Sequence, residues 1–114
     1  MENLQERALK ASEAFLARRG YEIVETGWSD GDSGIAIVAR DEDAYVMVDV
    51  AVGDANAERF PDAAQDRRSR EAAAAAWLAA RAPAEDAAVR FDTVSLMLIG
   101  ESKAFIRHHI NCLS

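Results

Sequence analysis

Two apolar stretches joined by a short acidic turn constrain the fold of this chain most strongly. Residues 34–40 (GIAIVAR) and 44–52 (AYVMVDVAV) are separated by an Asp-Glu-Asp turn at residues 41–43, which predicts an antiparallel hairpin. If the chain turns at residues 42 and 43, the numbers of paired residues sum to 85. Ala36 then lies opposite Asp49, and Gly34 lies opposite Ala51. Because residues two apart share a face of a strand, we expect all four positions on one face of the sheet.

Helix and strand signals flank this hairpin. Asn3 followed by Glu6 fits an N-cap with its capping-box partner, and Gly20 fits a C-cap, so residues 3–19 predict a helix. An alanine-rich run predicts a second helix over 62–82, with Pro83 ending it. The remaining segments are a strand at 21–26, a turn at 29–34, a loop at 53–61, and strands at 93–99 and 104–110. This order, α-β-β-β-α-β-β, predicts a mixed sheet with helices on its faces, an α/β or α+β layer structure.

Length and charge restrict the class of protein. The 114 residues suit a single domain over 1–114, and one cysteine, Cys112, permits no internal disulfide, which fits a reducing compartment. The first residues do not resemble a signal peptide, and no apolar run is long enough to span a bilayer, so we expect a cytoplasmic protein without membrane contact. The formal net charge of −7 argues against general nucleic-acid binding, since phosphates are held by Lys and Arg.

Scattered motifs carry a family resemblance across nearly the whole chain. They are AFLARRGYEIV (14–24), Trp28, GIAIVARDED (34–43), VMVDVAV (46–52), AWLA (76–79), VRFDTVSLML (89–98) and IRHHINCL (106–113). As a set, they resemble the bacterial YraN-like proteins, an uncharacterised family of the restriction-endonuclease-like superfamily. The resemblance implies an α/β fold with a mixed sheet flanked by helices. It also implies a site where acids of a GEID and an EVK motif hold Mg²⁺ or Mn²⁺, with a helix Glu and the EVK lysine assisting.

This sequence departs from the family pattern at almost every site position. Leu9 stands in place of the helix Glu, Gly34 and Ala36 in place of the GEID acids, and Ala51 in place of the lysine. Asp49 alone keeps a carboxylate, as a vestige of the EVK glutamate. One carboxylate does not make a magnesium site. We therefore expect no bound metal, no cofactor and no nuclease activity of the family type.

Other polar residues of the sequence are candidates to replace the missing site residues. Asp30 and Asp32 are interpreted as turn formers, and Asp92 as structural, although Asp92 could lie beside the old site. Arg67, Arg68 and Arg70 form the densest basic cluster; they could contact phosphates, but a solvated helix face is the simpler reading. Neighbouring residues of a strand face opposite ways, so His108 and His109 are not expected to share a metal. We expect a structural hydrogen bond for His108 and core positions for Trp28 and Trp77. Cys112 is interpreted as a small buried or terminal apolar residue.

Three functions compete on this sequence. The first is a catalytically inactive nuclease-fold protein that acts as a binding or interaction module, with an unknown protein partner or as a homo-oligomer. The second is a non-catalytic nucleic-acid binder, which the arginine cluster favours and the net charge opposes. The third is a metal-dependent nuclease with a rearranged site, which only the fold favours. The missing residues and the acidic charge favour the first.

Overall fold

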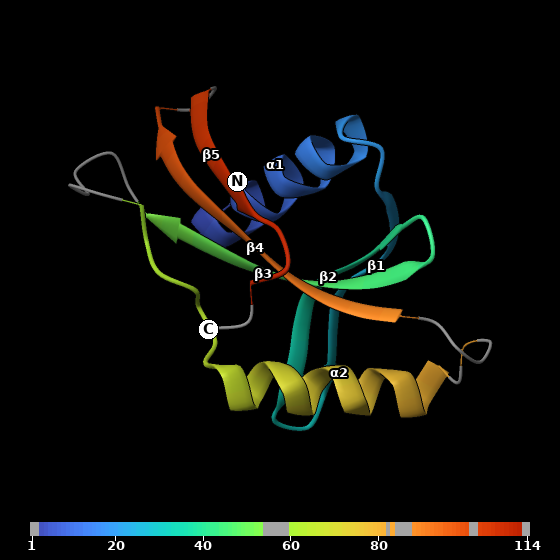
Figure 1. Cartoon of the computed structure of the whole chain (residues 1–114). Helices are drawn as coiled ribbons and strands as arrows, with labels where there is room; N and C mark the ends of the chain where they lie inside the picture. The colour runs from blue at the N-terminus through green and yellow to red at the C-terminus, as the bar shows by residue number, and fades with distance from the viewer. Residues whose placement is uncertain (1–2, 54–59, 82, 84–87, 101–102, 113–114) are drawn as a thin grey trace.

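A five-stranded mixed sheet forms the centre of the fold (Figure 1). The computed structural model describes residues 3–53, 60–81, 83, 88–100 and 103–112. The elements are α1 (Leu4–Arg18), β1 (Glu22–Asp30), β2 (Ser33–Asp41), β3 (Ala44–Gly53), α2 (Arg67–Arg81), β4 (Ala88–Ile99) and β5 (Lys103–His109). The strand order in the sheet is β1-β2-β3-β4-β5, with β3 and β4 parallel and all other neighbours antiparallel. The expected element order and α/β fold class are confirmed.

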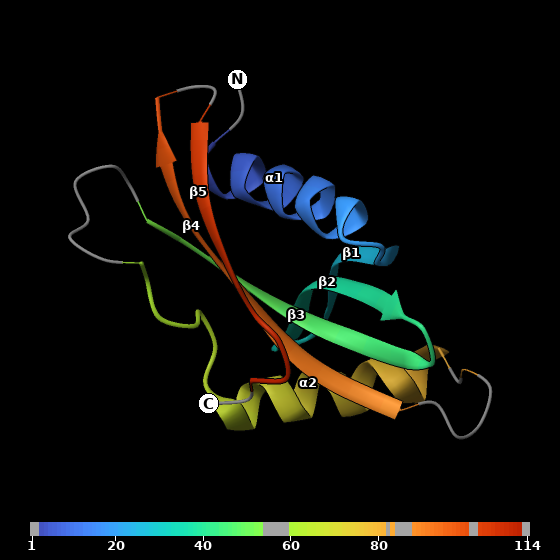
Figure 2. The ribbon, with the colours of Figure 1, turned by 45° about the horizontal axis from the view of Figure 1, so that its top comes forward.

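The two helices cover opposite faces of the sheet, as Figure 2 shows. One apolar cluster lies between the sheet and α1 and includes Leu16, Ile37 and Val48. The other lies between the sheet and α2 and includes Met47 and Trp77. Trp28 belongs to this second cluster, so both tryptophans are core residues as expected. None of the described helices is long and apolar enough to cross a membrane.

Helix α1 begins and ends where the local signals predict. The Asn3 Oδ1 atom accepts a hydrogen bond of 2.8 Å from the Glu6 backbone N–H. At the other end Gly20 has a φ of +93°, a left-handed conformation that glycine adopts at little cost. The amide of Tyr21 then bonds the Leu16 carbonyl, which closes the helix and directs the chain into β1.

Helix α2 begins at Arg67, five residues after the predicted start at position 62. The prediction of a helix from Asp62 is wrong, because a different aspartate caps the helix. Asp66 Oδ1 accepts a hydrogen bond of 2.8 Å from the Ser69 amide. Residues 60–66 run as an extended connection from the sheet to α2 (Figure 1), and this connection is called the strap below.

Four of the five strands are longer than predicted, and β5 has the predicted length. The predicted turn at 29–34 shrinks to two residues, because β1 continues to Asp30 and β2 begins at Ser33, with Gly31 at a φ of +62°. Strand β4 begins at Ala88, five residues before the predicted start at 93. The turn of the central hairpin is at Glu42 and Asp43, as predicted, and Glu42 has a φ of +54°. Most of the predicted loop at 53–61 lies outside the described residues.

Candidate functional site

Strands β2 and β3 part at the place where the family's site would lie. Their pairing runs from Asp41 with Ala44 to Ile37 with Val48, which confirms the predicted register. Beyond Ile37 and Val48 this ladder ends, while β2 stays paired with β1 as far as Ser33. Strand β3 likewise stays paired with β4 as far as Gly53. The resulting gap between residues 33–36 of β2 and 49–53 of β3 is called the fork below.

The four family site positions of the hairpin do not share one face of the sheet. Ala36 packs with the cluster beneath α1, and it lines an apolar cleft there with Leu9 and Val50. Asp49 points to the other face, where it lines a small cavity with Arg70 and Met47. The expectation of a shared face is therefore wrong. The physical reason is the fork: with the ladder gone, β2 breaks its alternation, so that Ala36 and Ile37 both contact the α1 side.

The strap crosses the fork and bonds to strands on both sides of it. The Ala64 backbone N–H donates a hydrogen bond of 2.6 Å to Asp49 Oδ2 on β3. The side-chain amide of Gln65 donates one of 3.3 Å to the Gly34 carbonyl oxygen on β2. The Ser95 hydroxyl on β4 donates one of 3.2 Å to the Pro61 carbonyl oxygen. Asp49, the one carboxylate left among the positions that the resemblance assigns to a site, thus holds the backbone of the strap.

The residues around Asp49 do not fit a magnesium or manganese ion. The Asp49 residue is 6% exposed, and one carboxylate oxygen already accepts the short bond from Ala64. The adjoining cavity has a volume of about 10 Å³, which is at most the space of one water molecule, whereas Mg²⁺ usually keeps several waters. A Cβ atom at Gly34 would lie 3.3 Å from the Trp28 carbonyl oxygen, so a side chain at this position would press on the backbone of β1. Among the described residues, no three His, Cys, Asp or Glu side chains are grouped to hold a metal.

The helix position of the family site is apolar as well. Leu9 of α1 meets Ala36 and Val50 in an open cleft of about 190 Å³, and Gln5 and Glu6 complete its lining. The structure thus brings Leu9 and Ala36 together, as the resemblance implies for the residues that they replace. It does not bring them to Asp49.

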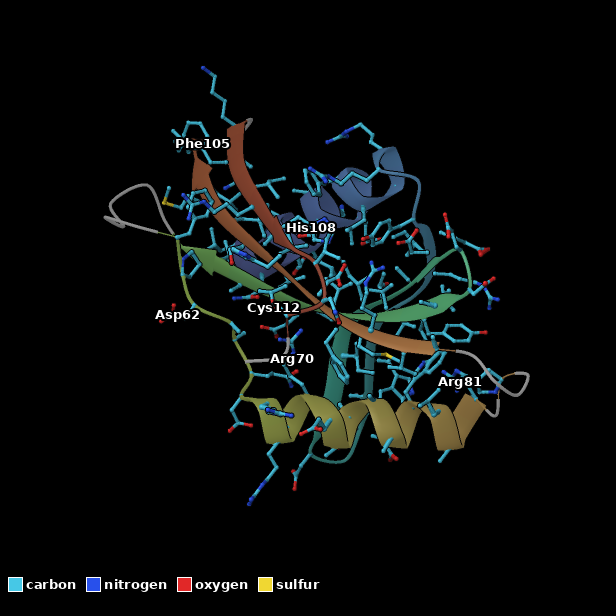
Figure 3. All side chains as sticks on the ribbon, in the orientation of Figure 1. Asp62, Arg70, Arg81, Phe105, His108 and Cys112 are labelled. Atoms are coloured by element: carbon cyan, nitrogen blue, oxygen red, sulfur yellow. The ribbon has the colours of Figure 1, made fainter. Side chains whose placement is uncertain are left out.

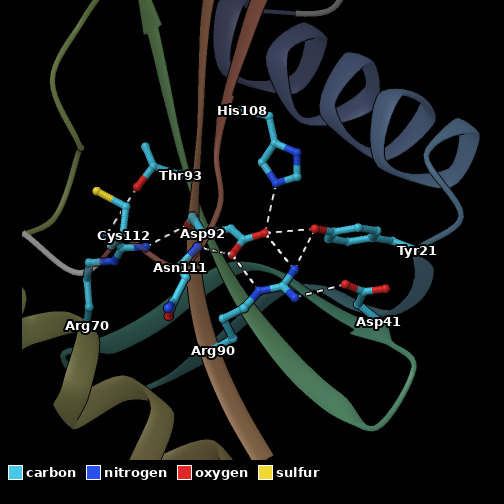
Figure 4. Close-up of polar contacts among 9 residues, drawn as sticks. All are labelled: Tyr21, Asp41, Arg70, Arg90, Asp92, Thr93, His108, Asn111 and Cys112. Carbon is cyan, nitrogen blue, oxygen red and sulfur yellow. Dashed lines mark hydrogen bonds and ion pairs between the residues drawn. The ribbon is translucent and has the colours of Figure 1, made fainter.

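Asp92 is the centre of a buried polar network on the α1 side of the sheet (Figure 4). Its side chain is fully buried, and Oδ2 accepts hydrogen bonds from His108 Nε2 at 2.8 Å and from the Tyr21 hydroxyl at 3.1 Å. Arg90 donates to both Asp92 oxygens and, through Nη1, to Asp41 at 2.8 Å. The Asn111 backbone N–H completes the set at 2.9 Å. Asp92 therefore ties β4 to β5 and to Tyr21, the residue before β1, and Arg90 extends the network to Asp41 at the end of β2. This arrangement fits a structural role.

The network perturbs the acidity of its members. Burial alone would raise the pKa of Asp92, but the hydrogen bonds from His108, Arg90 and Asn111 outweigh burial and hold that pKa well below its usual range. Burial, followed by the nearby Asp92 carboxylate, raises the pKa of Tyr21 to about 12. Hydrogen bonds to Asp92 and Asp41 raise the pKa of Arg90 against the effect of its own burial. Near neutral pH these shifts keep Asp92 and Arg90 charged and Tyr21 neutral.

The three arginines of α2 do not form one exposed cluster. Arg70 is only 4% exposed and points from α2 toward the sheet and Cys112 (Figure 3). It donates hydrogen bonds to the carbonyl oxygens of Asp92 and Cys112, at 2.7 and 3.0 Å, and to the Thr93 hydroxyl at 3.1 Å. The expectation of a solvated position is wrong for Arg70, because its guanidinium is buried and donates to those acceptors. A phosphate bound here would have to displace them. Arg67 and Arg68 are exposed, and Arg67 pairs with Glu71 at 3.5 Å.

The remaining candidates take the places that local patterns predict. His108 and His109 face opposite sides of the sheet: His108 is buried against Tyr21, and His109 lines an open pocket on the other face. Asp30 and Asp32 are exposed on either side of Gly31. Cys112 is half-buried, and its amide bonds the Phe91 carbonyl oxygen at 2.7 Å.

Sequence reasoning missed the strap. Gln65 and Ala64 carry no motif, and their partners lie 31 and 15 residues away in the chain. The one usable signal was Asp49 itself, a carboxylate that remains where its neighbours have lost theirs. Such a residue has either a remaining ligand or a new structural partner.

Comparison with protein families gives one match. The model of the family described as Uncharacterised protein family UPF0102 matches residues 9–96, which include the fork, the strap, α2, α1 from Leu9 onward and most of β4. A search of curated proteins gives no match for this chain.

Proposed function

We propose that this chain, which belongs to Uncharacterised protein family UPF0102, is a non-catalytic member of the family that works as a binding or interaction module. The observation that carries the proposal is the bond from the Ala64 amide to Asp49 across the fork. It engages the one carboxylate that a metal-dependent reaction at this place would need.

The surroundings of Asp49 support the same conclusion. Phosphodiester hydrolysis by a metal ion needs oxygen ligands on the metal and room for the attacking water. Here the other hairpin positions that the resemblance assigns to the family site are Gly34, Ala36 and Ala51, which carry no oxygen ligand in their side chains. The cavity that adjoins Asp49 is about 10 Å³. The strap also covers the face from which a phosphate would approach Asp49, since Asp49 is 6% exposed.

A cleavage assay tests the loss of catalysis. The full chain is incubated with labelled single-stranded DNA, duplex DNA and RNA in millimolar Mg²⁺ or Mn²⁺, and the products are compared with those formed in EDTA. We expect no metal-dependent product. The matched variant is Asp49→Asn, which keeps an oxygen acceptor for the Ala64 amide and removes the charge. Metal-dependent cleavage by the wild-type chain that Asp49→Asn lacks would overturn the proposal.

A further inference from the structure

Strand β5 is an open edge of the sheet with a basic character. It is the last strand in the sheet order, so no described strand pairs with its outer side. The described residues from Lys103 to Cys112 include Lys103, Arg107 and two histidines, and no acidic residue. The segment is therefore locally basic, although the whole chain has a net charge of −7. An open edge presents unpaired backbone N–H and C=O groups along its length.

One face of β5 carries four exposed side chains in alternation, namely Lys103, Phe105, Arg107 and His109. Phe105 is 57% exposed, the largest exposed fraction among the big apolar side chains of the described residues. Figure 3 shows it at the end of the sheet far from α2. These four residues are called the β5 stripe below. The other side chains of β5 point to the α1 side, where Ile106 packs on the core and His108 is buried.

The β5 stripe is partly preorganised. The Arg107 guanidinium lies 4.6 Å from the centre of the Phe60 ring, a cation–π contact that holds the charge beside the first residue of the strap. His109 lines an open pocket of about 340 Å³ together with Thr93 and Ser95 of β4. Pro61 and Asp62 of the strap line the same pocket. A segment that lies along β5 would therefore have room for its side chains on this face.

We infer that β5 binds an extended acidic peptide segment of a partner protein, which adds to the sheet as a sixth strand. This inference rests on the proposed function and names the class of partner. Backbone hydrogen bonds to an open edge supply the register-independent part of such binding, and side chains at alternate positions supply its specificity. The charge of the β5 stripe selects acidic side chains, and Phe105 selects an apolar one between them.

The stripe predicts the pattern of the bound segment. In an antiparallel addition, residues directly opposite share a face, and opposite charges in such pairs are stabilising. An acid opposite Lys103, an apolar residue opposite Phe105 and acids opposite Arg107 and His109 give, from the N-terminus, acid-x-acid-x-apolar-x-acid. The geometry favours a peptide over a nucleic acid because the unpaired backbone N–H and C=O groups lie along a strand edge. In addition, the net negative charge of the protein would repel a phosphate backbone.

The test is a titration of the full chain with synthetic heptapeptides. Binding is monitored by NMR chemical shifts or by calorimetry. The probe is Glu-Thr-Glu-Thr-Ile-Thr-Glu with blocked ends, and its charge control carries Lys in place of Glu. Two further probes are N-methylated, one at the first, third, fifth and seventh residues and the other at the remaining three. In a strand, alternate amides point to opposite edges, so only one of these sets donates to β5.

We expect saturable binding of the acidic probe, no binding of the Lys probe, and loss of binding with only one of the two N-methylated sets. Arg107→Glu should weaken binding about tenfold, since it replaces an attractive pair with a repulsive one. The matched control is Arg68→Glu, an equal charge change on an exposed residue of α2, which should leave binding unchanged.

Other outcomes would overturn the inference. Equal binding of the Lys probe, or equal effects of the two N-methylated sets, would mean that no strand is added. Binding of an RNA oligonucleotide in place of the peptide, or self-association of the chain through the β5 stripe, would assign the stripe to another partner. None of these results involves cleavage. Failure of this inference can therefore be distinguished from failure of the proposed loss of catalysis, which the nuclease assay tests.

Discussion

Replacing Asp49 by alanine distinguishes two roles for its carboxylate. The carboxylate either anchors the strap or is an unused remnant of a metal site. If the carboxylate were a remnant, its removal from a 6% exposed position would be neutral or stabilising, because an unpaired buried charge is costly. The structure instead gives it the Ala64 amide at 2.6 Å. A hydrogen bond to a charged group contributes about 1.5–3 kcal/mol. Because Ala64 is exposed and its amide can regain water, we expect Asp49→Ala to destabilise the chain by about 2 kcal/mol.

Urea unfolding followed by circular dichroism measures this change. With an m value of roughly 1.5 kcal/mol/M, the midpoint should fall by about 1.3 M. Asp49→Asn should lose less than half of this, since it keeps an acceptor. Asp62→Ala is the matched control, an exposed acid of the same strap that should change the free energy of unfolding by less than about 0.5 kcal/mol. An Asp49→Ala midpoint equal to or above that of the wild-type chain would refute the reasoning.

Three further predictions concern the network of Asp92. Asp92→Asn should lower the free energy of unfolding by about 3–5 kcal/mol, because Arg90 and His108 lose their buried carboxylate; a loss below about 1 kcal/mol in urea would count against this role. Because the folded-state pKa of Asp92 is depressed, its stabilisation is present at neutral pH and is lost as the pH falls below about 4, so acid unfolding of Asp92→Asn should show a weaker pH dependence there than the wild-type chain. Because the Tyr21 pKa is raised to about 12, stability should fall as the pH rises from 10.0 toward 12, and Tyr21→Phe should lack this fall in alkaline melting curves.

Local signals were sufficient for the first helix and for the hairpin. Asn3 and Gly20 determine the ends of α1 through contacts within a few residues, so the sequence alone predicts them. The hairpin register follows from the acidic turn, and its pairs from Ile37 with Val48 onward are as predicted. The order of elements then restricts the fold to a mixed sheet with a helix on each face.

Contacts distant in sequence explain the errors. A helix from Asp62 would include the Ala64 amide in its first turn, but that amide donates to Asp49 instead. The helix therefore begins only after Asp66, which caps it. Regular strand alternation predicts Ala36 beside Asp49. This prediction fails because the pairing of β2 with β3 ends at the fork. Charge pattern could not show that Arg70 faces the sheet, since its acceptors come from β4 and the residues that follow β5.

The most direct test of a closed, metal-free fork is paramagnetic broadening by Mn²⁺ in the NMR spectrum of the ¹⁵N-labelled chain. Even weak binding of this ion near a nucleus broadens its signal, so activity is not needed for the readout. At substoichiometric Mn²⁺ we expect the amide signals of Asp49, Ala51 and Ala64 to broaden no more than those of exposed acids such as Asp30 and Asp32. Selective loss of the Asp49, Ala51 and Ala64 signals, absent in Asp49→Asn, would contradict a closed fork without a metal.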